Sequence, residues 1–261
     1  MHRIVQLTDL HLQSDPAISY KGIDADAHLQ QCLNWIMTLK ARPDLLLLTG
    51  DLCHQGSHSA YKRLHQMLQR TGIANVWLAG NHDDKTTMAS VYGKPVDELQ
   101  QQSLGNWQLL LLDSNHQPDG CGGGSLSVVH LQQLEYRLKH LANQPTLVAL
   151  HHNPVPIREH WQDALMLANG ADMVRLLQQH PHVQAVLCGH VHQVLDRVVH
   201  GRRFLSAPAT SVQFANPWEE TTLKPELGPG LRLLELTSTG RLYTRIQYLP
   251  KLDQQLQSHA C

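Results

Sequence analysis

Five short segments of the chain carry histidine, aspartate and asparagine at spacings that suit metal binding. They read DLH at 9–11, GD at 50–51, GNHD at 80–83, HH at 151–152 and GHVH at 189–192. Imidazole and carboxylate ligands together favour zinc, manganese, iron or cobalt, whereas an all-oxygen set favours magnesium or calcium. One metal takes about four protein ligands, and the segments offer at least seven. We therefore expect two metal ions about 3.5–4 Å apart that share a carboxylate, an arrangement that holds a phosphoryl group for in-line attack by hydroxide.

Each of these segments directly follows an apolar run that predicts a β-strand. The predicted strands span 3–8, 44–49, 75–79, 146–150 and 183–188, and a similar run lies at 107–112. Most are continuous runs of leucine, valine and isoleucine, which are typical of strands covered on both faces. In α/β sheets, ligands gather beyond the carboxyl ends of the strands. The predicted strands therefore place the five segments where a common site can form.

The remaining apolar pattern predicts the elements around these strands. Helical spacing predicts helices over about 29–37, 61–68, 128–141 and 173–177. After about residue 190, strands follow one another at 194–199, 204–207, 231–236 and 242–249, with a Pro/Gly-rich loop around 216–230. This order predicts an α/β (α+β) fold of two packed sheets with outer helices. No long linker divides the chain, so we predict one domain over residues 1–250 and a weakly ordered C-terminal tail over 251–261.

Local geometry bears on whether the candidate side chains converge. Side chains two positions apart on an extended segment share a face, which would bring Asp9 together with His11, and His190 together with His192. Glycine precedes the ligand in three of the segments and permits a sharp exit from the strand. Each segment alone has a simpler interpretation, because Gly-Asp and GNHD are also common turns. Five of them at strand ends favour a dinuclear site.

Composition and charge limit the other classes of function. The 261 residues include 19 histidines, and the net charge is −1 with histidine neutral, so electrostatics alone does not predict binding to nucleic acid or to a membrane surface. No apolar run approaches the roughly 20 residues that span a bilayer. A strand-like run close to Met1 leaves no room for a signal peptide. The five cysteines show no CxxC spacing, which argues against disulfides or a thiolate zinc site and favours a cytoplasmic protein.

The ordered series of five segments resembles the calcineurin-like metallophosphoesterase superfamily from residue 3 to about residue 215. The sequence around the segments is similar to the bacterial class III 3′,5′-cyclic AMP phosphodiesterases. The similar stretches are WL before GNHD, LLLLDS at 109–114, LCGHVHQ at 187–193 and GRRFLSAPATSVQF at 201–214. The superfamily resemblance implies a four-layer αββα sandwich of two mixed sheets flanked by helices, the metallophosphoesterase fold.

The resemblance also implies roles for individual residues. It implies that four residues hold each of two metals and that Asp51 belongs to both sets. The first set is Asp9, His11, Asp51 and His192, and the second is Asp51, Asn81, His151 and His190. His82 matches the family histidine beside the phosphate and is the candidate catalytic residue, with Asp83 as a partner that could orient it. Asn81, His82 and His192 are the expected substrate-binding residues. We expect two metal ions per chain, iron with manganese or zinc.

These roles predict a reaction and a substrate. Hydroxide would attack the phosphorus of 3′,5′-cyclic AMP in line with O3′ and release 5′-AMP. The alternatives are a 2′,3′-cyclic nucleotide phosphodiesterase, a nucleotidase or a pyrophosphatase, and a DNA nuclease or a non-catalytic scaffold fits the sequence less well. We expect a small-molecule partner, no nucleic acid, no membrane, and a monomer or homodimer. Because ligating imidazoles must be neutral, activity should fall as the pH drops through about 6.

Several details depart from the resemblance or stand apart from it. Family members often carry an acidic residue four positions after the Gly-Asp aspartate, where this chain has Gln55. No lysine or arginine lies within the five segments, which suits a singly charged diester. The glycine-rich segment 119–127 is expected to be a flexible connection rather than a phosphate cradle, since no GKS or GKT follows. Cys53 and Cys188 are expected to be buried fillers, with oxidation sensitivity of the site as the alternative. Ordinary packing is expected for Phe214 and Trp218, with the lining of a base pocket as the alternative.

Overall fold

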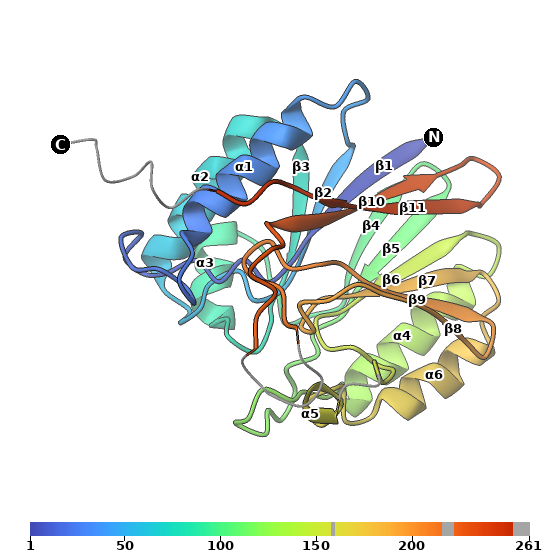
Figure 1. The fold of residues 1–261 in the computed structure, drawn as a ribbon. Coiled ribbons are helices and arrows are strands. Elements are labelled where there is room, and N and C mark those ends of the chain that lie inside the picture. The colour runs from blue at the N-terminus through green and yellow to red at the C-terminus, as the bar shows by residue number, and fades with distance from the viewer. Residues whose placement is uncertain (158–159, 216–221, 253–261) are drawn as a thin grey trace.

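The computed structural model describes residues 1–157, 160–215 and 222–252, and its strands form two mixed sheets (Figure 1). In the first sheet three parallel strands are extended by two antiparallel ones at one edge. The order is β11 (Leu242–Tyr248), β10 (Gly230–Leu236), β1 (His2–Leu7), β2 (Leu45–Thr49) and β3 (Ala74–Leu78). The parallel strands β1 to β3 run in the same direction, so their carboxyl ends lie at one edge of the sheet.

The second sheet has four parallel strands between two antiparallel edge strands. The order is β4 (Gln100–Leu104), β5 (Trp107–Leu111), β6 (Thr146–Ala149), β7 (Val183–Cys188), β9 (Arg202–Ser206) and β8 (Leu195–Val199). The strands β6 and β7, which lead into the segments 151–152 and 189–192, are neighbours in the middle of this sheet. Both sheets therefore deliver candidate ligands from adjacent parallel strands.

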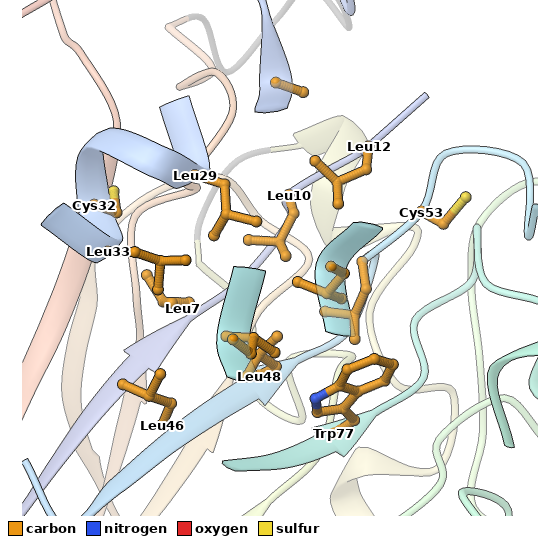
Figure 2. Close-up of a cluster of buried hydrophobic side chains, with 14 of the residues drawn as sticks. Leu7, Leu10, Leu12, Leu29, Cys32, Leu33, Leu46, Leu48, Cys53 and Trp77 are labelled. Atoms are coloured by element: carbon orange, nitrogen blue, oxygen red, sulfur yellow. The ribbon is translucent and has the colours of Figure 1, made fainter. Parts of the chain in front are cut away.

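Helices cover the outer face of each sheet (Figure 1). The helices on the first sheet are α1 (Ala25–Met37), α2 (His58–Thr71) and α3 (Lys85–Tyr92), and those on the second are α4 (Val128–His140) and α6 (Gly170–Gln178), with the short α5 (His160–Asp163) beside the loops. Figure 2 shows Leu29 of α1 above Leu7, Leu48 and Trp77 of the first sheet.

Three apolar clusters separate the layers. One lies between the first sheet and its helices, one between the second sheet and its helices, and one between the two sheets. Alternate residues of a strand enter different clusters, as Leu46 and Leu47 of β2 do. This alternation explains why the strands read as continuous apolar runs, since both faces are buried. The four-layer αββα sandwich expected from the sequence is confirmed.

The predicted strands and helices are confirmed, with strand ends that differ by two residues or fewer. Three elements were not predicted. The edge strand β4 has the sequence QQQSL, in which only the last residue is apolar and buried. Only Met88 of α3 is buried, and α5 has four residues. Short or exposed elements leave little apolar periodicity to detect.

Helix caps fix the chain immediately after two of the candidate segments. Ser57 caps α2, six residues after Asp51, and its hydroxyl accepts a hydrogen bond from Ala60 N at 3.3 Å. Asp84 caps α3 directly after the segment 80–83 and accepts from Thr87 N at 2.7 Å. These caps satisfy otherwise free amide groups and hold the segments 50–51 and 80–83 at defined distances from the helices.

None of the helices in the described ranges is long and apolar enough to cross a membrane. Residues 253–261 of the expected C-terminal tail lie outside the described residues. The organisation of residues 1–250 as one domain stays a prediction.

Candidate metal centre

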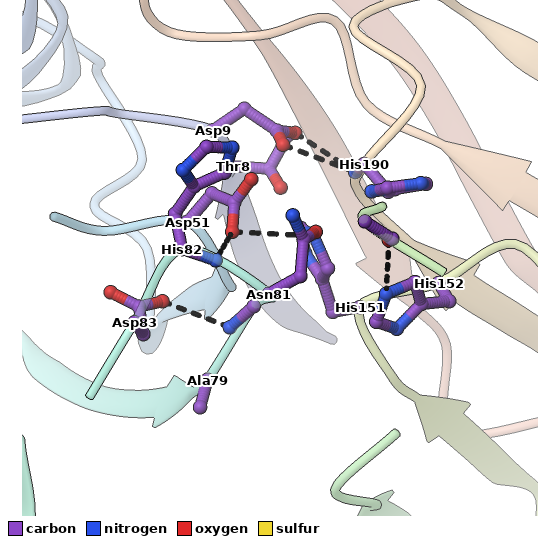
Figure 3. Close-up of polar contacts among 12 residues, drawn as sticks. Thr8, Asp9, Asp51, Ala79, Asn81, His82, Asp83, His151, His152 and His190 are labelled. Carbon is purple, nitrogen blue, oxygen red and sulfur yellow. Dashed lines mark hydrogen bonds and ion pairs between the residues drawn. The ribbon is translucent and has the colours of Figure 1, made fainter. Parts of the chain in front are cut away.

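The candidate ligands meet at the carboxyl ends of strands from both sheets. Figure 3 shows Asp9 after β1, Asp51 after β2, Asn81 after β3, His151 after β6 and His190 after β7 around one centre. The centre therefore lies across the end of the sandwich, between the sheets.

A buried glutamine joins the two sheets just beneath the centre. The side-chain amide of Gln6 donates to Thr49 Oγ1 at 3.0 Å and to the carbonyl of Cys188 at 2.9 Å. These bonds link β1 to its neighbour β2 and, across the sandwich, to β7. They hold the strand ends that deliver candidate ligands from opposite sheets at a fixed separation.

An unusual backbone conformation aims these side chains. Eight described residues other than glycine have a positive φ, and five of them are candidate ligands: Asp9, His11, Asp51, His190 and His192, with φ between 48° and 71°. Such conformations are costly for residues with a Cβ and cluster at functional sites. The expectation that the pairs 9/11 and 190/192 converge on extended segments is wrong, because all four residues have left-handed backbone conformations. Asp9 and His11 still approach the same group, whereas His190 and His192 belong to different sets of facing ligand atoms.

Backbone hydrogen bonds hold two of these turns against each other. Asp9 N donates to the carbonyl of Gly50 at 3.0 Å, and His11 N donates to the carbonyl of Asp51 at 2.9 Å. The strained segment after β1 is thus tied to the strained segment after β2. This pairing positions the side chains of both segments together.

The three glycines have two different roles. Gly50 has a φ of +96°, as expected for a sharp exit from β2. Gly80 and Gly189 do not have positive φ, which corrects the expectation for them. A Cβ on Gly80 would collide with the Asp51 carboxylate, and one on Gly189 would collide with the Thr8 side chain. These two positions require glycine because other groups approach closely.

The ligand atoms of the candidate residues face one another in two groups. In the first, His11 Nε2 lies 3.1 Å from His192 Nε2 and 3.6 Å from Asp51 Oδ2, and His192 Nε2 lies 3.5 Å from Asp9 Oδ1. In the second, His151 Nε2 lies 3.5 Å from Asp51 Oδ1 and 3.1 Å from Asn81 Oδ1. The two carboxylate oxygens of Asp51 therefore each face a different group.

The outward nitrogens of two histidines are fixed by backbone carbonyls. His151 Nδ1 donates to Thr49 O at 2.8 Å, and His192 Nδ1 donates to Val212 O at 2.7 Å. A carbonyl only accepts, so the proton of each neutral ring is on Nδ1. The lone pair of each Nε2 is then directed into the centre, which is the arrangement in which proteins hold metal-ligating histidines.

Burial also sets the charge of the centre. It lowers the pKa of His11, His151 and His190, and it lowers the pKa of His192 to about 4, so these imidazoles are neutral near pH 7. Burial, with the nearby Asp51 carboxylate, raises the pKa of Asp9 well above its ordinary value. No lysine or arginine of the described ranges forms an ion pair with either carboxylate.

This donor set fits divalent or trivalent cations. Two buried carboxylates beside neutral imidazoles leave negative charge without a partner, and burying uncompensated charge is costly. Four sets of side chains place their ligand atoms within 4.8 Å of one another around this centre: Asp9, His11 and His192; Asp9, Asp51 and His151; His151, His152 and His190; and His11, His54 and His82. Mixed nitrogen and oxygen donors suit a transition metal.

The amino-acid sequence matches a known family over the region that builds this centre. Residues 2–194 match the family model described as calcineurin-like phosphoesterase. The chain belongs to the calcineurin-like phosphoesterase family.

Relatives within the family cover almost the whole chain. A 3′,5′-cyclic-nucleotide phosphodiesterase of Nostoc sp. is 35% identical over 248 residues, which cover 95% of this chain and 92% of the relative. The 3′,5′-cyclic adenosine monophosphate phosphodiesterase CpdA of Escherichia coli is 36% identical over 249 residues, covering 95% and 90%. A dimetal phosphatase from Danio rerio superposes with a TM-score of 0.69 at 12% identity, over 96% of this chain and 99% of that one. At this low identity, the last match shows the fold alone.

His82, the candidate catalytic residue, lies beside the two groups, and its ring forms no ion pair with a carboxylate of the described residues. Its backbone N–H donates to Asp51 Oδ1 at 3.0 Å, and its ring packs edge-on against His11 at 4.9 Å. Its Nδ1 donates to the carbonyl of His54 at 3.1 Å. The expected orienting partner, Asp83, makes no contact of this kind with His82.

Asp83 instead ties neighbouring segments together. Its carboxylate accepts hydrogen bonds from the backbone N–H of Leu52, Cys53 and Gly80 and from the hydroxyl of Tyr61. Burial and the nearby Asp51 raise the pKa of Asp83 to about 7. The segments 50–53 and 80–83 are therefore joined through one half-buried carboxyl group.

A cavity of about 220 Å³ opens onto the centre. Asn81, His82 and His192 line it, as their expected role in substrate binding requires. Lys21 also lines it, outside all five motif segments, and the sequence offered no signal for it. Lys21 is the only permanently cationic side chain on the described cavity wall.

Two aromatic rings in the wall of this cavity stack on candidate histidine ligands. Tyr20 stacks on His11 with ring centroids 4.3 Å apart, and Phe214 stacks on His192 at 4.4 Å. The expectation of ordinary packing for Phe214 is therefore incomplete, since the ring contacts a candidate ligand and lines the cavity. Trp218 lies outside the described residues.

The loop 119–127 does more than connect elements, because Gly122 lines the cavity and its carbonyl contacts His152 Nε2 at 3.0 Å. Gln55 is exposed. Cys53 and Cys188 are fully buried, as predicted, and burial raises the pKa of the Cys188 thiol to about 12, so it is unreactive near neutral pH.

Proposed function

We propose that this chain is a metal-dependent phosphodiesterase that hydrolyses 3′,5′-cyclic AMP to 5′-AMP at the candidate metal centre. One observation carries the proposal: the two carboxylate oxygens of Asp51 face different histidines, Oδ2 lying 3.6 Å from His11 Nε2 and Oδ1 lying 3.5 Å from His151 Nε2. A carboxylate placed in this way suits a pair of cations that share it. Family membership and the names of the relatives, which act on 3′,5′-cyclic nucleotides, support the same reaction.

The proposed ligand sets follow the two groups of facing atoms. Asp9, His11, Asp51 and His192 would hold one metal, and Asp51, Asn81, His151 and His190 would hold the other, with iron and manganese or zinc as the proposed pair. When bound, the two cations supply a hydroxide near neutral pH and draw charge from the phosphoryl oxygens. The neutral imidazoles allow the metals to bind without first losing protons.

The side chains of the protein orient the substrate and handle the proton. Asn81, His82 and His192 would contact the phosphodiester from the cavity wall. His82 Nδ1 is held by the His54 carbonyl, which leaves Nε2 for the substrate. In the reaction a P–O bond to hydroxide forms and the P–O3′ bond breaks. His82 would enter this step with a proton on each ring nitrogen, keep the Nδ1 proton on the His54 carbonyl and give the Nε2 proton to the leaving O3′.

The proposal extends to the setting of the enzyme. We propose a cytoplasmic protein that acts on a small cyclic nucleotide, as a monomer or homodimer, without a nucleic-acid or membrane partner. The net charge of −1 supports the absence of a polyanion partner. The relatives act on small cyclic nucleotides according to their names.

A comparison of substrates on one metal-defined preparation tests the proposal. The preparation would be assayed with 3′,5′-cyclic AMP, 2′,3′-cyclic AMP, a UDP-sugar lipid analogue and single-stranded DNA. We expect 3′,5′-cyclic AMP to have the highest kcat/KM and 5′-AMP to be the product. If another substrate were cleaved and 3′,5′-cyclic AMP were not, the substrate assignment would be wrong while a metallophosphoesterase reaction would stand.

A further inference from the structure

His54 lies between a candidate metal ligand and the family histidine, although it belongs to none of the five segments. Its Nδ1 is 3.3 Å from Nδ1 of His11. Its ring stacks on that of His82, with centroids 4.7 Å apart and 26° between the planes. Its backbone carbonyl accepts the hydrogen bond from His82 Nδ1 at 3.1 Å. One residue therefore contacts both the metal centre and the cavity.

The contact with His11 differs from those of the other histidines. His151 and His192 donate their Nδ1 protons to backbone carbonyls. The outward nitrogen of His11 faces another imidazole instead. Because an imidazole nitrogen either donates or accepts according to its tautomer, the direction of this hydrogen bond depends on which nitrogen of His11 faces the metal.

The inward atom of His11 is Nε2, which lies 3.1 Å from His192 Nε2 and 3.6 Å from Asp51 Oδ2. Its Nε2 lone pair must be free to bind a metal, so the ring proton of neutral His11 is on Nδ1. That proton then points to His54 Nδ1, which must accept it. The remaining proton of neutral His54 is consequently on its Nε2.

Tyr20 fixes the same ring from another direction. It stacks on His11 with centroids 4.3 Å apart and an angle of 14° between the planes. Stacking holds the plane of the ring but does not decide its tautomer or its rotation within that plane. The hydrogen bond to His54 is the contact that decides both.

We propose that His54 is a positioning residue of the metal centre: it accepts the Nδ1 proton of His11 and thereby directs His11 Nε2 toward the first metal. This inference rests on the proposed dinuclear centre. It also gives the segment after Gly-Asp a role in this chain, through the side chain at position 54, whereas Gln55 is exposed. Partners that orient a ligating histidine typically change metal affinity by about 10- to 100-fold when removed.

Two substitutions separate the acceptor from the bulk of the side chain. His54→Phe keeps a flat ring against His82 but has no nitrogen to accept from His11. His54→Gln supplies a side-chain oxygen that accepts. His58→Ala is the matched control, because His58 is an exposed histidine four residues further on. His54→Leu is a second variant without an acceptor, for use if the phenylalanine variant does not fold.

Binding of Mn²⁺ alone, measured by competition with a chromophoric chelator in the absence of substrate, gives the main readout. We expect two sites in the wild type, one of which is about 10- to 100-fold weaker in His54→Phe, while the other is unchanged. His54→Gln should regain most of the affinity, and His58→Ala should match the wild type. The visible spectrum of the Co²⁺-substituted protein should change in His54→Phe, because the geometry around the metal held by His11 changes.

The possible failures are distinguishable. Wild-type affinity for both ions in folded His54→Phe would overturn the role of His54 and leave the dinuclear centre intact. A folded His54→Gln as weak as His54→Phe would also overturn it, since the acceptor would then be irrelevant. Fewer than two Mn²⁺ ions bound by the wild type would refute the dinuclear centre itself and this inference with it.

Discussion

The space between the two sheets has two regions that are equally buried and chemically opposite. The sandwich interior is packed with apolar side chains, which include those of Ile4, Leu47, Leu109 and Leu147. The polar edge lies at the carboxyl ends of the strands and contains residues with 0–3% of their surface exposed: Asp9, His11, Asp51, His151 and His192. Burial therefore does not distinguish the two regions, and the difference lies in what each buries.

The two regions make opposite contributions to folding. The sandwich interior consists of extended strands whose apolar side chains are removed from water, which stabilises the fold. The polar edge holds left-handed residues, neutral imidazoles and two close carboxylates, each of which costs free energy in the chain alone. The interior thus stabilises a structure in which the polar edge is ready for cations. Substitutions in each region should separate stability from metal binding.

The largest effect is expected for Asp51→Ala in the polar edge. The variant loses the carboxylate shared by both groups of ligands, so both metals should be lost. Activity should fall by more than the roughly 100-fold that follows loss of a supporting contact. The metal-free variant should be at least as stable as the metal-free wild type, because one of two repelling buried carboxylates is gone. Metal content and chemical unfolding of the metal-free proteins measure these effects.

Full activity of metal-loaded Asp51→Ala would contradict the shared-carboxylate assignment. His192→Ala is a useful companion, because its side chain belongs to the first group only. It should lose one metal and retain the other. Loss of both ions in the His192 variant would show that the two groups do not bind independently.

His82→Ala should separate metal binding from turnover within the polar edge. His82 touches the centre through its backbone N–H, which survives the substitution, so both metals should remain. The rate should fall by about 10²- to 10⁴-fold, the usual range for loss of a general acid. Metal analysis and kcat on the same preparation provide the test. Loss of the metals in this variant would give His82 a ligand role instead.

Leu109→Ala tests the sandwich interior. Leu109 lies in β5, is fully buried between the sheets, and belongs to a strand that leads into none of the five segments. Loss of its side chain should lower the free energy of unfolding by about 2–5 kcal/mol. The affinity for metal and the kcat of the folded protein should remain those of the wild type. A large drop in metal affinity at unchanged stability would remove the distinction between the regions.

The same contrast explains what the sequence could and could not predict. Apolar runs predicted the buried strands, because two-sided burial leaves a continuous signal, as in the leucines of β2. The strand ends then predicted where the candidate ligands would gather. The left-handed turn at Asp9 leaves no such trace, since nothing in the residue type requires it. Lys21 and His54 reach the site through loops, and their positions depend on tertiary contacts that no local pattern records.

The metal content of the protein should depend less on pH near neutrality than it would with histidines of ordinary pKa. Burial lowers the pKa of the candidate histidine ligands, to about 4 for His192, so protonation of these imidazoles competes with metal only well below the ordinary value of about 6.5. Metal content should stay constant from pH 7 to about 5 and fall near pH 4. The loss of activity that the sequence predicts near pH 6 is therefore expected at a lower pH.

The stability of the metal-free protein should depend on pH in a different way from its metal content. The unfolded chain takes up protons as the pH drops below about 6.5 while the buried imidazoles do not, so the metal-free fold loses stability over that same interval. Metal analysis after dialysis, with unfolding of the metal-free protein at each pH, checks both statements. Metal loss already complete at pH 6 would show that the imidazoles are not shielded by burial.

The smallest effect is expected at the mouth of the cavity, where the polar edge meets solvent. Tyr20 and Ile23 exchange backbone hydrogen bonds of 2.9 and 3.0 Å, which form a tight turn with positive φ at Lys21 and Gly22. This turn holds Lys21 Nζ 5.9 Å from the Tyr20 ring centroid and 5.8 Å from that of Phe214. The ammonium group therefore lies over the two rings that stack on candidate ligands, in contact with solvent.

An exposed charge in this position should attract the anionic substrate without taking part in the chemical step. Lys21→Met should raise the KM for 3′,5′-cyclic AMP by about 2- to 5-fold, the range expected for an exposed charge pair, and leave kcat unchanged. The effect should shrink as salt screens the charge, and Lys62→Met, an exposed lysine on α2, should have none. A lower kcat at unchanged KM would instead place Lys21 among the groups that act on the reacting phosphate, and the boundary of the polar edge would then include the turn at 20–23.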